Sequence, residues 1–72
     1  MKKIVFNYSK LKGKITEMCG TRKSFAEMLG ISEGTLISKL KSETYFTQKE
    51  IFMAIDILAI APEEVTLYFF TM

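Results

Sequence analysis

The segment that most constrains the fold of this chain is residues 21–41, TRKSFAEMLGISEGTLISKLK, which predicts two short helices joined by a tight turn. Gly30 can adopt the left-handed backbone that ends the first of these helices, and Ser32 can cap the second. Ile31 is an apolar residue between them, which indicates that the turn itself packs against a core. The apolar residues with helical spacing are Phe25, Ala26, Leu29, Leu36 and Leu40. The pattern therefore predicts a helix pair whose relative orientation is fixed by a packed turn.

A further helix is predicted before this pair, ending at Gly20 and capped by Asn7 or Ser9. Its core residues, three and four apart, would be Tyr8, Leu11, Ile15 and Met18. Residues 2–6 have strand propensity but no partner strand, so we expect an extended arm packed on the helices.

Two more helices are predicted after residue 41. Thr47 and Glu50 have the spacing of a capping box, and the helix that follows would bury Ile51, Ala54, Ile55 and Leu58. A short last helix would begin at Pro62 and present Val65, Tyr68 and Phe69. The sequence thus predicts an all-α fold: a compact five-helix domain, residues 1–72, with a central helix-turn-helix at about 21–41 and an extended N-terminal arm.

Residues 21–41 resemble the helix-turn-helix of lambda-repressor-like phage regulators, in which an F-A-x-x-L-G-I-S run precedes T-L-x-x-x-L. This chain carries the run at residues 25–32, followed by Thr35, Leu36 and Leu40. The likeness continues through FTQKEI (46–51) and APEEV (61–65), so it covers most of the chain. In finer detail the chain resembles small Cro-like or modulator-of-repression proteins of temperate phages of Gram-positive bacteria.

The resemblance implies that the third helix enters the major groove of double-stranded operator DNA. Thr35 and Ser38 would reach base edges, whereas Lys39 and Lys41 would lie nearer the phosphate backbone of the DNA. The start of the preceding helix would position phosphate, because its first turn exposes N–H groups beside two cations. The expected DNA contacts are Thr21, Arg22, Lys23, Glu33, Gly34, Thr35, Ser38, Lys39 and Lys41.

Three residues of the presumed reading helix depart from the family. Glu33 could accept from a cytosine amino group but is repelled by phosphate, and its charge also suits the first turn of a helix. Gly34 removes a base reader, and Ile37 would offer an apolar contact to another protein or belong to the core margin. The aromatic residues at the C-terminus would likewise belong either to the core or to an interface with a partner. The expected contacts with a protein partner are Glu33, Gly34, Ile37, Lys41, Tyr68, Phe70 and Met72.

Charge is unevenly placed along the chain, although the net charge is only +2. Residues 1–23 contain seven Lys or Arg against one acid, a local charge of +6, and the remainder has three against seven, a charge of −4. Such polarity fits a basic face for phosphate or for an acidic protein, and also an ordinary solvated surface.

Chemistry-bearing residues are scarce. There is no His, and the single Cys19 gives neither an intramolecular disulfide nor a metal site of the His/Cys type, so no enzyme, metal, cofactor or small-molecule substrate is expected. No apolar run is long enough to span a bilayer or to act as a signal peptide. We expect a cytoplasmic protein of the bacterial host cell with no membrane partner.

Two functions remain open on the sequence. The first is a transcriptional regulator in a lysis/lysogeny-type switch that binds operator DNA, with a homodimer matching the two half-sites. The second is an antirepressor-like modulator that binds a phage repressor protein and alters its DNA binding, with weak or no DNA binding of its own.

Overall fold

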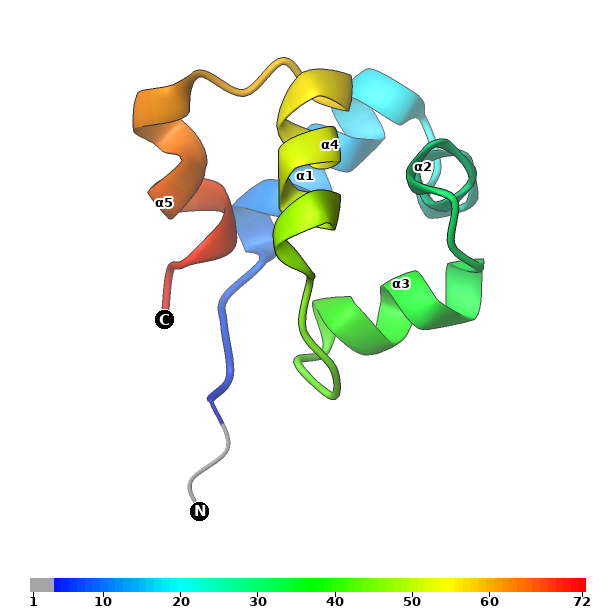
Figure 1. The fold of residues 1–72 in the computed structure, drawn as a ribbon, viewed down its shortest axis with the longest axis horizontal. Coiled ribbons are helices and arrows are strands. Elements are labelled where there is room, and N and C mark those ends of the chain that lie inside the picture. The colour runs from blue at the N-terminus through cyan, green and yellow to red at the C-terminus, as the bar shows by residue number, and fades with distance from the viewer. Residues whose placement is uncertain (1–3) are drawn as a thin grey trace.

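In a computed structural model that describes residues 4–72, five α-helices surround one hydrophobic core (Figure 1). A 3-10 turn leads into the last helix, and the described residues include no strand. The elements are α1 (Ser9–Cys19), α2 (Arg22–Leu29), α3 (Glu33–Leu40), α4 (Gln48–Ile57), η1 (Pro62–Glu64) and α5 (Val65–Phe69). The predicted all-α fold is confirmed.

Three helices begin where the sequence places a capping residue. The hydroxyl oxygens of Thr21, Ser32 and Thr47 each accept a hydrogen bond from the backbone N–H three residues later. The capping box at α4 is complete, because the Glu50 carboxylate also accepts from the Thr47 N–H at 2.8 Å. Local sequence signals therefore set the starts of α2, α3 and α4.

The first helix differs from the prediction at both ends. Its N-cap is Tyr8, not Asn7 or Ser9, although the Asn7 side-chain oxygen accepts from the Ser9 N–H at 3.0 Å. Met18, expected in the core, is 46% exposed, because the last turn of α1 packs through Cys19 instead. Gly20 ends the helix with a φ of 83°, as predicted.

The core is centred on side chains from α1, α2, α3 and the end of α4, which are fully buried: Leu11, Ile15, Phe25, Leu36 and Leu58. Phe46 and Phe69 close it in an edge-to-face pair with ring centroids 5.5 Å apart. On α4, Ala54 is buried as expected, whereas Ile51 and Ile55 are only half-buried. Ile60, 5% exposed, packs the turn after α4 against the core, and Ala59 in this turn has a left-handed φ of 53°.

The expected arm is present over its described part. Residues 4–7 have no regular structure and pack against the helices, with the Phe6 N–H donating to the Ser42 hydroxyl and the Asn7 N–H donating to the Thr71 carbonyl. The Tyr45 hydroxyl donates to the Ile4 carbonyl at 2.7 Å. The beginning of the expected arm, with Lys2 and Lys3, lies outside the described residues.

None of the helices found in residues 4–72 has the length and apolar character needed to cross a membrane.

Candidate functional site: the outer face of α3

The turn between α2 and α3 holds α3 in one orientation. Gly30 has a φ of 79°, the left-handed conformation predicted for it, and the Ile31 N–H donates to the Ala26 carbonyl at 3.0 Å. Ile31 is half-buried against the core. Because the turn is both hydrogen-bonded and packed, it sets the orientation of α3, which lies at the edge of the molecule (Figure 1).

The first turn of α3 is exposed. Glu33, Gly34 and Thr35 all face solvent, and Ser32 donates its hydroxyl hydrogen to Thr35 Oγ1 at 2.8 Å while accepting from the Thr35 N–H. The Thr35 hydroxyl is therefore already engaged as an acceptor and keeps its own hydrogen free. We call the accessible or half-buried residues of this helix, with the residue after it, the α3 outer face: Glu33, Gly34, Thr35, Ile37, Ser38 and Lys41.

Ile37 and Ser38 lie at the margin of this face. Both are half-buried, so Ile37 is neither a core residue nor a fully exposed apolar contact. The Ser38 carbonyl accepts from the Glu43 N–H at 3.0 Å, which folds the loop after α3 back against the helix. The second half of α3 is thus less accessible than the first.

Lys39 does not belong to this face, contrary to the expectation that it would lie near phosphate. The residue is 7% exposed, and its ammonium nitrogen is 3.0 Å from Glu50 Oε1 and donates to the Tyr45 carbonyl at 2.9 Å. It also lies 5.9 Å from the centre of the Phe46 ring. Its charge is used to join the end of α3 to the start of α4.

The partner of Lys39 is a capping carboxylate whose pKa reflects the same arrangement. Burial alone would raise the pKa of Glu50, but hydrogen bonds from the Thr47 N–H and from Lys39, with the lysine charge, more than offset that effect. The pKa of Glu50 is consequently lower than its ordinary value. The carboxylate stays ionised and holds both the helix cap and the lysine.

The start of α2 forms a separate basic patch. Thr21, Arg22 and Lys23 are all exposed, and the Thr21 hydroxyl oxygen accepts from the Ser24 N–H at 3.1 Å. Neither Arg22 nor Lys23 forms an ion pair with another residue of the described part of the chain. These cations are free to meet an anion at a helix N-terminus.

The C-terminal residues predicted as partner contacts do not join the α3 outer face. Tyr68 is 8% exposed, so the structure removes it from the surface: its ring packs in the core. Phe70 and Met72 are exposed, but Phe70 lies beside the arm, 6.2 Å from the Phe6 ring. The C-terminus and the start of α3 lie at opposite sides of the molecule in Figure 1.

Two exposed apolar residues lie outside the sites predicted from the sequence. Phe52 is 75% exposed and Met28 is 54% exposed, and they line one open hollow between α2 and α4. The available signal was their position off the apolar stripes of their helices.

The one thiol shows no sign of activation. Cys19 is half-buried, with its sulfur 3.9 Å from the sulfur of Met28, and burial raises the pKa of the thiol. A nucleophilic cysteine needs the opposite shift. Its surroundings fit a packing role at the end of α1.

Residues 4–72 match the family described as "Protein of unknown function (DUF739)". The chain belongs to this family. No curated protein gave a significant match.

Among solved structures, the protein is similar to the modulator of repression (MOR) of the temperate bacteriophage TP901-1 from Lactococcus lactis, determined in solution. The two share 39% sequence identity and a TM-score of 0.79, over 96% of this chain and 93% of that one. The resemblance to phage modulators of repression is therefore confirmed, and it supports a role in phage regulation.

Proposed function

We propose that this protein is a modulator of repression that binds a phage repressor protein through the α3 outer face. The similarity to a protein named as a modulator of repression supports a partner of this kind. The single observation that carries the proposal is the makeup of the first turn of α3, where the exposed residues are an acid, a glycine and a threonine.

This surface is poorly equipped to read DNA. Glu33 is exposed at the end of α3 that would face phosphate and would be repelled by it. Gly34 presents backbone where a base-reading side chain would be needed, and nothing lies within 4 Å of the position a Cβ would occupy. Lys39 is withdrawn into its ion pair with Glu50. A protein surface with a basic residue opposite Glu33 and a small projection opposite Gly34 fits the face better.

Operator DNA is the second candidate, and one observation favours it. Arg22 and Lys23 are exposed without ion-pair partners in the described residues, next to the first N–H groups of α2. This arrangement positions phosphate in proteins that place the following helix in the major groove.

A gel-shift experiment separates the two functions. The full chain is titrated onto phage operator DNA alone, then with the phage's repressor present, at low and at physiological salt. The proposal predicts no specific shift by the chain alone and a changed repressor shift in its presence. A salt-sensitive, sequence-specific shift by the chain alone, lost in Arg22→Ala and in Lys23→Ala, would instead establish the DNA-binding function.

The surface itself is tested with a matched pair of glycine variants. Gly34→Gln adds a side chain to the centre of the α3 outer face, whereas Gly13→Gln adds the same side chain to the exposed side of α1, and both positions are open. Repressor binding, measured by calorimetry, should fall at least tenfold for Gly34→Gln and stay unchanged for Gly13→Gln. Equal affinities for the two variants would exclude α3 as the contact.

A further inference from the structure

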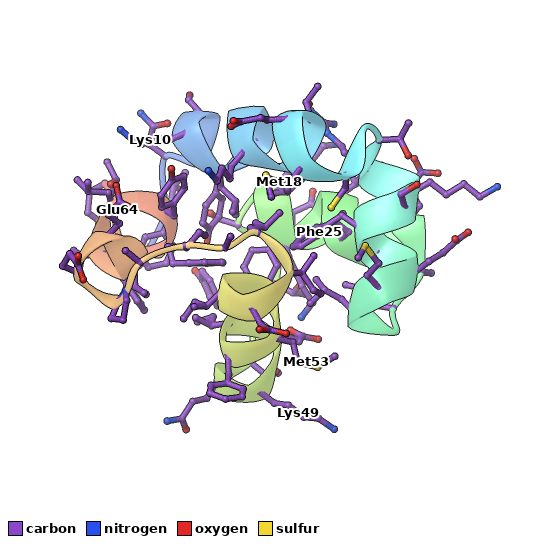
Figure 2. All side chains as sticks on the ribbon, turned by 90° about the horizontal axis from the view of Figure 1, so that it is seen from above. Lys10, Met18, Phe25, Lys49, Met53 and Glu64 are labelled. Carbon is purple, nitrogen blue, oxygen red and sulfur yellow. The ribbon has the colours of Figure 1, made fainter. Side chains whose placement is uncertain are left out.

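The outward side of α4 carries a regular stripe of four residues. Lys49, Phe52, Met53 and Asp56 occupy positions i, i+3, i+4 and i+7 of the helix, opposite the buried Ala54. Lys49, Phe52 and Asp56 are exposed and Met53 is half-buried. Figure 2 shows Lys49 at the part of α4 that lies away from α1, with Met53 beside the same helix. We call these four residues the α4 stripe.

The α4 stripe borders an open hollow of about 870 Å³. Phe52, Met53 and Asp56 line it together with Met28 of α2, and among the lining residues that the structure describes Asp56 is the only charged one. An exposed phenylalanine beside an apolar hollow provides a projection and a recess on one surface. Flexible methionine side chains on both walls can adapt to an inserted ring.

We propose that the α4 stripe is a dimerisation surface that binds the same stripe of a second copy of this chain in antiparallel orientation. A two-fold axis passing between residues 52 and 53 pairs each position with its counterpart. It brings Lys49 of one copy opposite Asp56 of the other, and Phe52 opposite Met53. The Lys49–Asp56 ion pair and the Phe52–Met53 contact are each formed twice, as a closed two-fold interface requires.

Charge complementarity selects a second copy as the occupant. A partner must present an acid, two apolar residues and a base at the same spacings in reverse order, and α4 read backwards does this. The parallel arrangement would place Lys49 against Lys49 and Asp56 against Asp56, which disfavours it. The seven-residue separation of the two charges spans about 10.5 Å along the helix, a length that two closely packed helices can match.

The interface goes beyond the proposed function because it uses none of the residues of the α3 outer face. A contact built on one ten-residue helix and the rim of the hollow is small, so the dimer belongs to the weak class of interfaces, below about 1,200 Å² of buried surface. The dimer would carry two copies of the α3 outer face.

Sedimentation equilibrium of the full chain, from micromolar to millimolar concentration, measures the association directly. The proposal predicts reversible dimerisation that Phe52→Ala weakens at least tenfold. Leu67→Ala, which truncates an apolar residue of α5 that is 49% exposed, is the matched control and should leave the association unchanged. Both variants should fold, because each replaced side chain lies on the surface, and thermal unfolding checks this.

Charge reversal tests the two-fold pairing itself. Lys49→Glu alone and Asp56→Lys alone place like charges opposite each other twice, so each should weaken the dimer roughly tenfold. In an equimolar mixture, a dimer that contains one copy of each variant again has opposite charges at both pairs. Association should therefore return to the level of the unmodified chain. Lys12→Glu, a reversal on the exposed side of α1, is the control and should have no such effect.

A chain that stays monomeric at millimolar concentration would overturn the proposal, as would failure of the mixture to restore association. If Phe52→Ala removed repressor binding while the unmodified chain remained monomeric, the α4 stripe would bind the repressor and the dimer would be wrong. None of the sedimentation measurements contains repressor or DNA. They can therefore contradict the dimer while the proposed function holds, and they can support the dimer while the proposed function is wrong.

Discussion

The two ends of α3 differ in burial and in what holds them. The first turn is exposed, contains a glycine and depends on the Ser32 cap. The second half has Lys39 and Leu40 buried and is held by Glu50, by the loop and, through Ser42, by the arm. One end of this helix is accessible to a partner, while the other end is held against the domain.

The largest effect is expected from removing the cation at the fastened end. Lys39→Met leaves the Glu50 carboxylate largely buried without its partner, so the free energy of unfolding should fall by about 3 kcal/mol. Lys41→Met, two residues further and exposed, is the control and should change it by less than about 0.5 kcal/mol. Urea denaturation measures both, and equal stability of the two variants would show that the Lys39–Glu50 pair does not fasten α3.

A smaller loss is expected where the arm meets the same end. Ser42 is fully buried and accepts from the Phe6 N–H at 3.0 Å, so Ser42→Ala leaves that N–H unpaired at a cost of about 1–2 kcal/mol. Hydrogen exchange at the Phe6 amide should accelerate in parallel. Unchanged exchange there would mean that the arm is held by its other contacts.

At the exposed N-terminal end of α3, the Ser32 cap should contribute to the stability of the protein. Ser32→Ala deletes the acceptor for the Thr35 N–H and should destabilise the protein by about 1 kcal/mol. Ser32→Asp retains an acceptor and should restore most of the loss. Thermal unfolding of the three proteins tests this, and a fully stable Ser32→Ala variant would show that water replaces the cap.

The free end should also tolerate a stabilising change. Gly34→Ala places a methyl group in open space on a helix, which should raise the free energy of unfolding by up to about 1 kcal/mol. Gly30→Ala should instead lower the free energy of unfolding, because Gly30 has a φ of 79°, a left-handed conformation that alanine adopts unfavourably. A loss in Gly34→Ala would reveal a contact at this turn that the structure does not contain.

The smallest effect is expected in acid. The pKa of Glu50 is lower in the folded protein than its ordinary value of 4.5, so its contribution is complete above that pH and is lost as the pH falls through the folded-state pKa. Glu50→Gln should therefore show a shallower loss of stability below about pH 4.5 than the unmodified chain. Parallel acid slopes in the two proteins would mean that other carboxylates dominate.

Much of the fold could be predicted because its signals are local. Thr21, Ser32 and Thr47 act on the N–H groups three residues away, and Gly20 and Gly30 adopt their left-handed conformations within a single turn. Helix starts and stops of this kind need no knowledge of the remaining chain. Met18 was misplaced because both Met18 and Cys19 lie near the core side of the last turn of α1, and the approach of α2 decides between them.

The candidate site was predicted only in part. Glu33, Gly34, Thr35 and Lys41 are exposed as the expected contacts must be, whereas Lys39 and Tyr68 are buried. A lysine in a predicted surface helix gives no local sign that a carboxylate eleven residues later will reach it. The same is true of Phe52 and Met28, which border one hollow although they come from different helices.

The helices, their caps and the turn between α2 and α3 follow from local sequence, because these features depend on backbone geometry and on side chains within one turn of each other. Which charged side chains are free of ion pairs, and which apolar residues remain exposed, became clear only from the folded domain. Those outcomes depend on how α4, the loop after α3 and the arm pack against the helix pair, and packing between distant segments is not encoded in any single stretch of the chain.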